Sequence, residues 1–261
     1  MRLVAHNEAN EVEVARAGGI GLRRDYIGSP GLIDESPQAF YVDRLYPEAR
    51  IDPHFHDVDQ FQVVVAGHCR MGKKEAAPIT FQYADAYTPY GPIVGGKEGF
   101  AFFTLRPVAS GGFFAMPGNR HKMPGRAGRN IAGRLKITDP LPASGKTFRE
   151  SLMNYADDGV MAMGLYFGPN ACAEGPASTG GGQYYLVCDG ALEVGDKRMA
   201  RQSLIHVEPG EAAPSLCAGI NGAAVMVLQF ARPSVRPGSN PHALATRDPN
   251  DYVQRPEGSG R

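Results

Sequence analysis

Three side chains between residues 54 and 60 are of the types that hold a metal ion. His54, His56 and Gln60 are separated by even numbers of residues. Side chains at such spacings project from one face of an extended strand. Two imidazole rings and an amide oxygen on one face suit a divalent first-row metal. Asp57 and Asp59 have the opposite parity, so we expect them to face away from the other three.

The elements that position these residues are predicted to be strands. Residues 61–66 are apolar apart from Gln62 and include three β-branched valines, which indicates a strand buried on both faces. Gly67 predicts the end of that strand and the start of a turn. Short apolar runs between glycines and prolines favour an all-β barrel or sandwich, and they cover 39–42, 61–66, 100–105, 162–167, 184–188 and 223–230. A weak pattern over 148–156 predicts one short helix.

The histidine pair and its surroundings resemble the first motif of the cupin superfamily. That motif has a leading Gly, a His-x-His pair, a Glu and a second Gly at fixed intervals. His54, His56 and Gly67 stand at matching positions, while Gln60 replaces the Glu and Glu48 replaces the leading Gly. The resemblance implies two intact metal ligands and one altered ligand.

The second cupin motif, Pro-x-Gly-x-x-His, is similar to a stretch further along the chain. Pro89 and Gly91 match it, and Val94 stands where the histidine belongs. The resemblance implies double-stranded β-helix (jelly-roll) barrels that bind a small molecule inside. It also implies a single divalent metal ion (Fe, Mn, Ni or Zn) and a homo-oligomer, in the simplest case a homodimer.

Two functions remain open at this stage. In the first, a metal on His54, His56 and Gln60 makes the chain a dioxygenase, lyase or isomerase. In the second, the metal site has decayed, and the protein binds a small ligand without catalysis. The three side chains then form a polar cluster that hydrogen-bonds within itself and to water.

Other polar residues of the same region could orient a carboxylate or an enol of the ligand. The alternative for each is a packing or surface role. The ligand-binding candidates lie on predicted strands or turns and are Arg70, Tyr83, Tyr90 and Arg106.

The chain contains an internal repeat at a shift of 123 residues. Gln60 falls on Gln183 and Gly67 on Gly190 at that shift. Pro89 matches Pro209 at a shift of 120, which predicts a hairpin that is three residues shorter in the second copy. The sequence 102–107 resembles 228–233. The resemblance thus extends over most of the chain as a two-cupin protein, or bicupin.

The second copy has lost the candidate metal ligands. Ala177 and Thr179 correspond to the two histidines, and Pro214 corresponds to Val94. His206 stands alone, and a lone strand histidine is usually structural. We therefore expect the second barrel to act as a scaffold, an interface or a pocket wall.

The repeat predicts an N-terminal barrel over 1–135, a C-terminal barrel over 136–236 and an irregular tail over 237–261. Between the barrels, 107–149 is rich in glycine and basic residues. It is interpreted as a solvated linker, with a substrate-closing loop as the alternative. Residues 134–138 alternate like a strand and are expected to cross between the barrels.

Composition narrows the partners and the location. The 27 basic and 27 acidic side chains give a formal net charge of zero, which argues against a nucleic-acid binder. No apolar run is long enough to span a bilayer, and the N-terminus lacks an apolar signal core. The four cysteines have no paired spacing and are interpreted as free thiols, which predicts a cytoplasmic protein.

Overall fold

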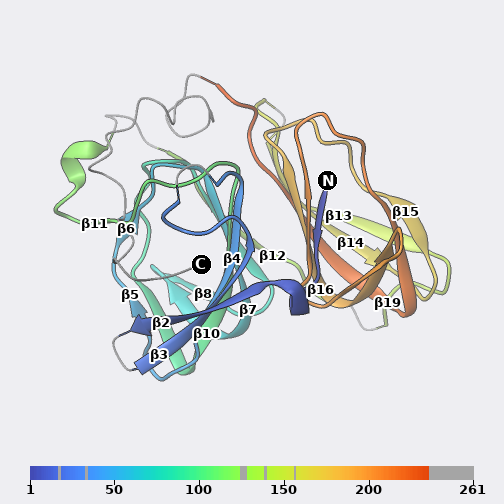
Figure 1. Ribbon diagram of the computed structural model, residues 1–261, viewed down its shortest axis with the longest axis horizontal. Helices are drawn as coiled ribbons and strands as arrows, with labels where there is room; N and C mark the ends of the chain where they lie inside the picture. The colour runs from blue at the N-terminus through green and yellow to red at the C-terminus, as the bar shows by residue number, and fades with distance from the viewer. Residues whose placement is uncertain (17–18, 33–34, 124–127, 138–139, 156, 235–261) are drawn as a thin grey trace. The chain divides into compact units, whose positions relative to one another are not determined.

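The chain folds into two units of antiparallel β-structure (Figure 1). The computed structural model describes residues 1–16, 19–32, 35–123, 128–137, 140–155 and 157–234. One unit comprises Glu11–Ala132 and is called the 11–132 unit. The other combines Met1–Asn10 with Gly133–Pro233 and is called the 133–233 unit. The predicted tail, 237–261, lies outside the described residues.

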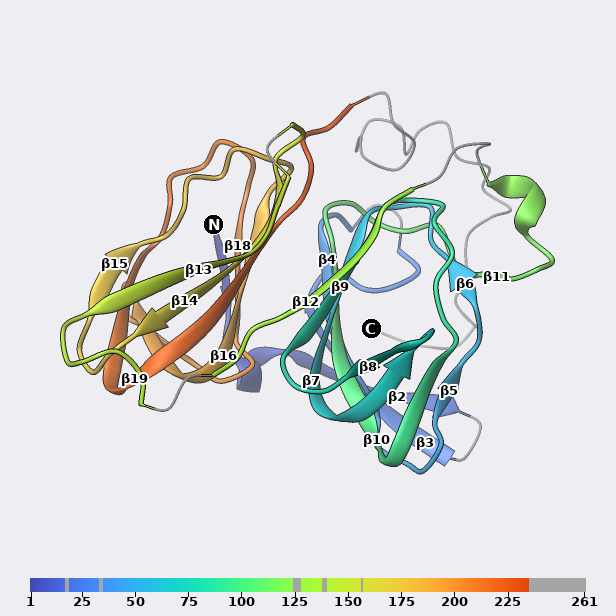
Figure 2. The same ribbon diagram turned by 180° about the vertical axis from the view of Figure 1, so that it is seen from behind.

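The 11–132 unit is built on a nine-stranded sheet that curls around its own interior (Figure 2). A small two-stranded sheet and the short helix η2 (Arg120–Lys122) complete it. The main sheet has the order β12 (Asn130–Arg134), β9 (Thr80–Ala84), β7 (Gln60–Met71), β10 (Ile93–Arg106), β4 (Gln38–Arg44), β3 (Gly19–Ile27) and β2 (Asn10–Arg16), with β5 (Arg50–Ile51) on β10 and β8 (Lys74–Ala76) on β7; the small sheet pairs β11 (Phe114–Ala115) with β6 (His54–Phe55).

The 133–233 unit has an eight-stranded sheet and the short helix η1 (His6–Glu8). Its first strand comes from the N-terminus of the chain, because β1 pairs with β18. The first ten residues are therefore grouped with this unit, whereas the sequence predicted them in the N-terminal barrel. The sheet has the order β1 (Arg2–Val4), β18 (Leu204–Val207), β16 (Gln183–Val194), β19 (Ser215–Gln229), β14 (Val160–Phe167) and β13 (Thr147–Tyr155), with β15 (Cys172–Glu174) on β19 and β17 (Lys197–Ala200) on β16.

The all-β prediction is confirmed. All six apolar runs lie in strands, and only Phe230, the last residue of the sixth run, falls outside one. The short helix predicted over 148–156 is wrong, because 148–155 belongs to β13. That strand pairs with β14 from Thr147 to Tyr155, and the cross-strand hydrogen bonds outweigh a weak local helical preference.

Gly67 does not end its strand as predicted. β7 continues to Met71, and Gly67 sits at an irregularity of the ladder with a φ of +65°. A Cβ at this position would lie 2.2 Å from the Gly99 carbonyl oxygen, so only glycine fits. Gly190 repeats the arrangement with a φ of +66° against Gly222.

The two units share one strand register at a constant offset of 123 residues. Met71 pairs with Lys74 in one hairpin, and Val194 pairs with Lys197 in the other. These hairpins have equal length, so the predicted shortening by three residues is not in them. The register also places Arg106 opposite Gln60 and Gln229 opposite Gln183. Arg106 thus corresponds to Gln229, three residues from the match inferred from sequence.

The segment between the predicted barrels is not a solvated linker. Within 107–132, β11 pairs with β6, and β12 extends the main sheet beside β9. The strand predicted over 134–138 is displaced, because β12 ends at Arg134. Glycines and basic residues suggested a linker, whereas Arg129 forms an ion pair with Asp85 and Gly111 donates to Asp57 inside the folded unit.

Two of the four cysteines are not free thiols. Cys172 and Cys217 face each other across β15 and β19 and form a disulfide, while Cys69 and Cys188 are buried free thiols. The prediction of four free thiols is therefore wrong for this pair. Spacing could not reveal it, because 45 residues separate the two cysteines. The cytoplasmic location stays a prediction with less support.

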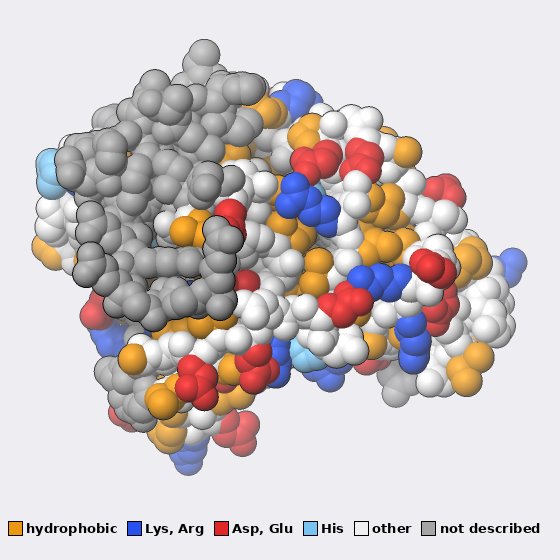
Figure 3. All heavy atoms as spheres, viewed as in Figure 1, with side chains coloured by type: hydrophobic (Ala, Val, Ile, Leu, Met, Phe, Trp, Pro, Cys, Tyr) orange, Lys and Arg blue, Asp and Glu red, His pale blue; other side chains and the backbone are white. Residues whose placement is uncertain are grey.

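The surface shows no concentration of one charge where it can be seen. On the part of the face in Figure 3 that is not grey, basic and acidic side chains are interspersed, as the formal net charge of zero suggests. The two helices in the described part of the chain have three residues each, far too short to cross a membrane.

The disulfide predicts a count of thiols. Denatured protein should react with a thiol reagent at two cysteines without reductant and at four after reduction. Cys172→Ser should leave three reactive thiols without reductant and lower the free energy of unfolding by about 3–4 kcal/mol, as expected for a bond that closes a loop of this length. Four reactive thiols in unreduced wild type would contradict the bond.

Candidate functional site

The His-x-His pair stands on a very short strand of the 11–132 unit. His54 pairs with Ala115 of β11 on one side and forms an isolated bridge with Tyr90 on the other. Phe55 points the opposite way and stacks on Phe114, with ring centroids 5.1 Å apart. The two imidazoles consequently face one side, with centroids 5.2 Å apart. The predicted parity of the pair is confirmed.

Backbone carbonyls fix the tautomer of both histidines. His54 Nδ1 lies 2.7 Å from the Asp52 carbonyl oxygen, and His56 Nδ1 lies 2.5 Å from that of Gly112. A carbonyl oxygen only accepts, so each Nδ1 carries the proton and each Nε2 keeps its lone pair. Burial lowers the pKa of His54 to about 4 and that of His56 well below its usual value. Both rings are therefore neutral at neutral pH.

Arg106 lies at the centre of the site. Its Nε donates to Gln60 Oε1 at 3.0 Å, and one terminal nitrogen donates to Gln38 Oε1 at 3.2 Å. The other terminal nitrogen is 3.4 and 3.5 Å from the ring nitrogens of His56. The guanidinium also lies 5.2 Å from the centre of the Phe40 ring, a cation–π contact. A buried positive charge therefore adjoins both Gln60 and His56.

Tyr90 closes the side of the site next to His54. Gln60 Nε2 donates to the Tyr90 hydroxyl at 2.5 Å, and the Tyr90 and His54 ring centroids are 4.6 Å apart. Burial raises the pKa of Tyr90, so the phenol stays protonated. His54, His56, Gln60, Tyr90 and Arg106 thus form one continuous polar cluster.

Comparison with solved structures defines the fold. The chain matches a candidate dioxygenase of Nostoc punctiforme at 15% identity, over 90% of this chain and 84% of that one, with a TM-score of 0.62. It matches nickel(II)-bound pirin of Escherichia coli at 11% identity, over 88% of this chain and 99% of that one, with a TM-score of 0.52. It also matches a deletion mutant of Bacillus subtilis oxalate decarboxylase at 12% identity, over 88% of this chain and 77% of that one, with a TM-score of 0.56.

The chain has the cupin jelly-roll fold. No protein-family model matches its sequence, and no curated protein matches it. Among these cupin structures, the pirin is a nickel(II) complex, and the oxalate decarboxylase has Mn(II) centres. The likeness extends over most of the chain, but at these identities it establishes the fold and not the activity.

Tyr90, and not Val94, adjoins the histidines. Val94 pairs with Arg50 and Arg70, whereas its neighbour Ile93 packs into the core cluster that contains Tyr90. Successive residues of a strand face opposite sides, so Val94 points away from the site. Val94, where the motif has its last histidine, therefore does not line the site.

Two of the four ligand-binding candidates lie in the site and two do not. Tyr90 and Arg106 belong to it. Arg70 is exposed near the far end of β7, where it pairs with Glu75 and Val94. Tyr83 lies on the opposite face of the sheet from Gln60, and its ring packs on Phe61.

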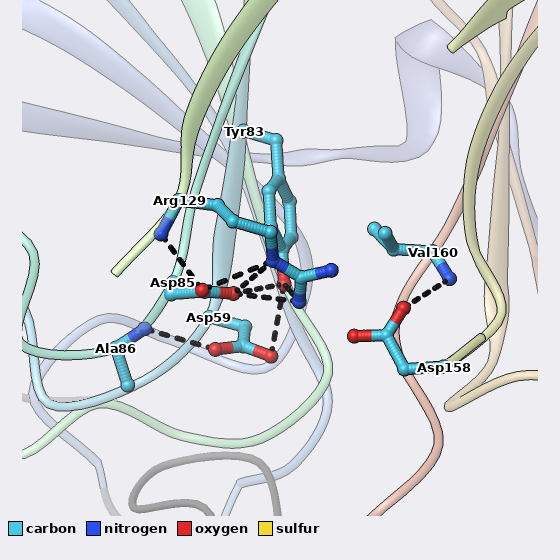
Figure 4. A network of polar contacts seen from close by, with 7 residues as sticks. All are labelled: Asp59, Tyr83, Asp85, Ala86, Arg129, Asp158 and Val160. Carbon is cyan, nitrogen blue, oxygen red and sulfur yellow. Dashed lines mark hydrogen bonds and ion pairs between the residues drawn. The ribbon is translucent and has the colours of Figure 1, made fainter. Parts of the chain in front are cut away.

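The Tyr83 hydroxyl belongs to a separate ionic network of the 11–132 unit (Figure 4). It lies 3.1 Å from an Asp59 oxygen and 2.9 Å from an Asp85 oxygen, so its one proton is shared between the two carboxylates, and Arg129 binds the Asp85 carboxylate. Asp59 also accepts from the Ala86 amide. These contacts hold β9, the turn after it and the start of β12 together. Asp59 faces away from the histidines, as its parity predicted.

Asp57 holds the loop 110–113, which contacts both histidines. Its carboxylate accepts from the Ser110 hydroxyl at 2.8 Å and from the Gly111 amide at 3.0 Å. The same loop supplies the Gly112 carbonyl that orients His56. It also supplies Phe113, whose half-exposed ring stacks on His54 with centroids 4.1 Å apart. The sequence did not indicate this loop, because its glycines suggested a linker.

The side chains present do not fit a divalent metal ion well. In the described part of the chain, no group of three or more His, Cys, Asp or Glu side chains is arranged to hold one. Gln60 Oε1, the third expected ligand, already accepts from Arg106. A guanidinium this close to Gln60 and His56 repels a dication, and no carboxylate in the cluster offsets the repulsion.

The buried histidines predict a loss of stability in acid. His54 has a pKa of about 4 when folded, against 6.5 for a free histidine. The unfolded chain therefore binds more protons between these values, and stability falls as the pH drops from 6.5 toward 4, by about 3 kcal/mol for this residue. In urea titrations, His54→Gln should weaken the pH dependence of the unfolding free energy. The exposed His121→Gln is the control, and equal pH dependence in wild type and His54→Gln would contradict the prediction.

Proposed function

We propose that the protein is a two-cupin small-molecule binder that takes a carboxylate-bearing ligand at Arg106. The observation that carries this proposal is the buried guanidinium, held by the neutral amide oxygens of Gln60 and Gln38 and directed at neutral His56. Arginine presents paired donors that match a carboxylate. Its two amide partners orient the cation through hydrogen bonds and carry no charge themselves.

A second arginine strengthens the positive potential of this interior. Arg44 lies on β4 at the same parity as Gln38 and Phe40, so it projects from the same face. Its Nε is buried and hydrogen-bonds to none of the described residues. The charges of Arg106 and Arg44 both push the pKa of His54 down, although burial is the larger cause. An anionic ligand would gain from both cations.

The neutral histidines favour ligand binding over general-base catalysis. An imidazole whose pKa is about 4 holds a proton poorly at neutral pH, whereas an efficient general base has a pKa near the working pH. With Nδ1 protonated and directed at a carbonyl, each Nε2 can accept a hydrogen bond from a ligand hydroxyl. The non-catalytic alternative is therefore preferred to a metal-dependent dioxygenase, lyase or isomerase.

The constant offset between the units supports a duplicated cupin in which only one copy binds ligand. At the corresponding place in the 133–233 unit, Gln183 donates to Gln229 at 2.8 Å and to the Ala177 carbonyl at 2.9 Å. Tyr185 donates to Gln183 Oε1. These neutral groups satisfy one another, so this unit is proposed to serve as a scaffold.

Removing the guanidinium should weaken carboxylate binding. We expect Arg106→Met to weaken the binding of heptanoate, measured by calorimetry, by about tenfold or more, because a hydrogen bond to a charged group contributes about 1.5–3 kcal/mol. Arg70→Met removes an exposed arginine of the same unit and is the matched control. Circular dichroism should show that both variants fold. Absence of heptanoate binding by wild type, or undiminished binding by folded Arg106→Met, would contradict the proposal.

The same charge argument predicts metal content. Wild type purified without a histidine tag should contain well under one Fe, Mn, Ni or Zn ion per chain by mass spectrometry. The double variant Gln60→Glu/Arg106→Met restores a carboxylate and removes the cation, so it should bind Mn(II) or Ni(II) at least tenfold more tightly. About one metal per wild-type chain, lost in His54→Ala, would instead favour the metal-dependent enzyme.

A further inference from the structure

A second polar row lies beside the Arg106 site, one step further along the same face of the sheet. Gln62 follows Gln60 by two residues on β7 and therefore shares its face. It stands directly opposite Gln82 of β9 and Thr104 of β10. The next pair along this face, Val64 and Phe102, already belongs to the hydrophobic core cluster.

The two glutamines of this row carry buried polar atoms without partners. Gln62 Oε1 and Gln82 Nε2 are buried, and neither has a hydrogen-bond partner among the described residues. The side chains are only 5% and 6% exposed. Burying an acceptor or a donor in this state costs free energy, so such groups are rare in folded proteins and call for an explanation.

The position of this row beside Arg106 suggests that a ligand group pairs with its unpaired amide atoms. The distance along β7 from Gln60 to Gln62 is about 7 Å. A ligand whose carboxylate meets Arg106 would place its other end there. The row of Gln62, Gln82 and Thr104 has no charged member, so it suits a neutral group better than a second carboxylate.

We infer that Gln62 and Gln82 recognise a neutral group that both donates and accepts hydrogen bonds, such as a primary amide or a hydroxyl, on the ligand that Arg106 binds. The inference rests on the proposed function. It narrows the ligand class to a monocarboxylate with an amide or hydroxyl about 7 Å from the carboxylate. The two glutamines act as specificity determinants, because a ligand without the polar group would leave them unpaired.

The test compares two probes of similar length. Adipamate, the monoamide of adipic acid, carries both groups, whereas heptanoate carries the carboxylate alone. We expect wild type to bind adipamate at least tenfold more tightly than heptanoate in calorimetry. Gln62→Leu and Gln82→Leu should each bring the ratio of the two affinities close to one while heptanoate binding persists. Because each change removes an unpaired buried polar group, thermal unfolding should occur at the wild-type temperature or above.

The possible outcomes distinguish a failure of this inference from a failure of the proposed carboxylate site at Arg106. Heptanoate binding that depends on Arg106, with no preference for adipamate in wild type, would overturn the specificity role and leave the carboxylate site standing. A preference that survives in both leucine variants would do the same. If wild type binds neither probe, the carboxylate site itself is wrong, and the inference fails with it.

Discussion

The site depends on the hydrogen bond from Arg106 to Gln60. At the position of Gln60, the cupin motif carries an anionic ligand. A glutamate there would form an ion pair with Arg106, and the two charges would cancel. The amide instead orients the guanidinium and carries no charge of its own. One change of residue type thus replaces an expected metal ligand by a neutral partner of Arg106.

The acidic side chains of this region hold the segments around the site in place and do not belong to the polar cluster itself. Asp57 holds the loop that supplies the Gly112 carbonyl and Phe113. Asp59 and Asp85 hold the turn after β9 and the start of β12. Buried carboxylates are tolerated when their oxygens accept several hydrogen bonds. These contacts keep the negative charges on the far side of the strands, so they do not offset Arg106 from within the cluster.

Much of the architecture could be predicted from the sequence, because buried strands need apolar runs and alternation sets which side chains share a face. The strands and the shared face of His54 and His56 follow from these rules. The errors lie where register matters. A count of residues placed the last motif position at Val94, but Ile93 and not Val94 faces the core cluster that contains Tyr90. Gly67 predicted a turn, but a glycine with positive φ also occurs at an irregularity inside a strand, as Gly67 does in β7.

The other errors concern contacts between residues far apart in the chain. The bond between Cys172 and Cys217 depends on the pairing of β15 with β19, which no local pattern encodes. The loop 110–113 looked like a linker because glycine and serine are common in linkers. Its role comes from Asp57, more than fifty residues earlier. Gly112 contacts His56 through its backbone carbonyl. Such a contact cannot be predicted from side-chain types, because any residue carries a carbonyl group.

Comparison of the two units shows two different partners for the same glutamine. Gln183 and Gln60 occupy equivalent places, and so do Gln229 and Arg106. Where both partners are glutamines, the amides bond to each other, to carbonyls and to a tyrosine, and the polar groups are satisfied within the chain. Where one partner is an arginine, the same frame contains a cation that neutral amides orient. The same strand frame thus accommodates either a neutral amide pair or an arginine opposite the first glutamine of the long strand, and the proposed carboxylate site depends on the arginine.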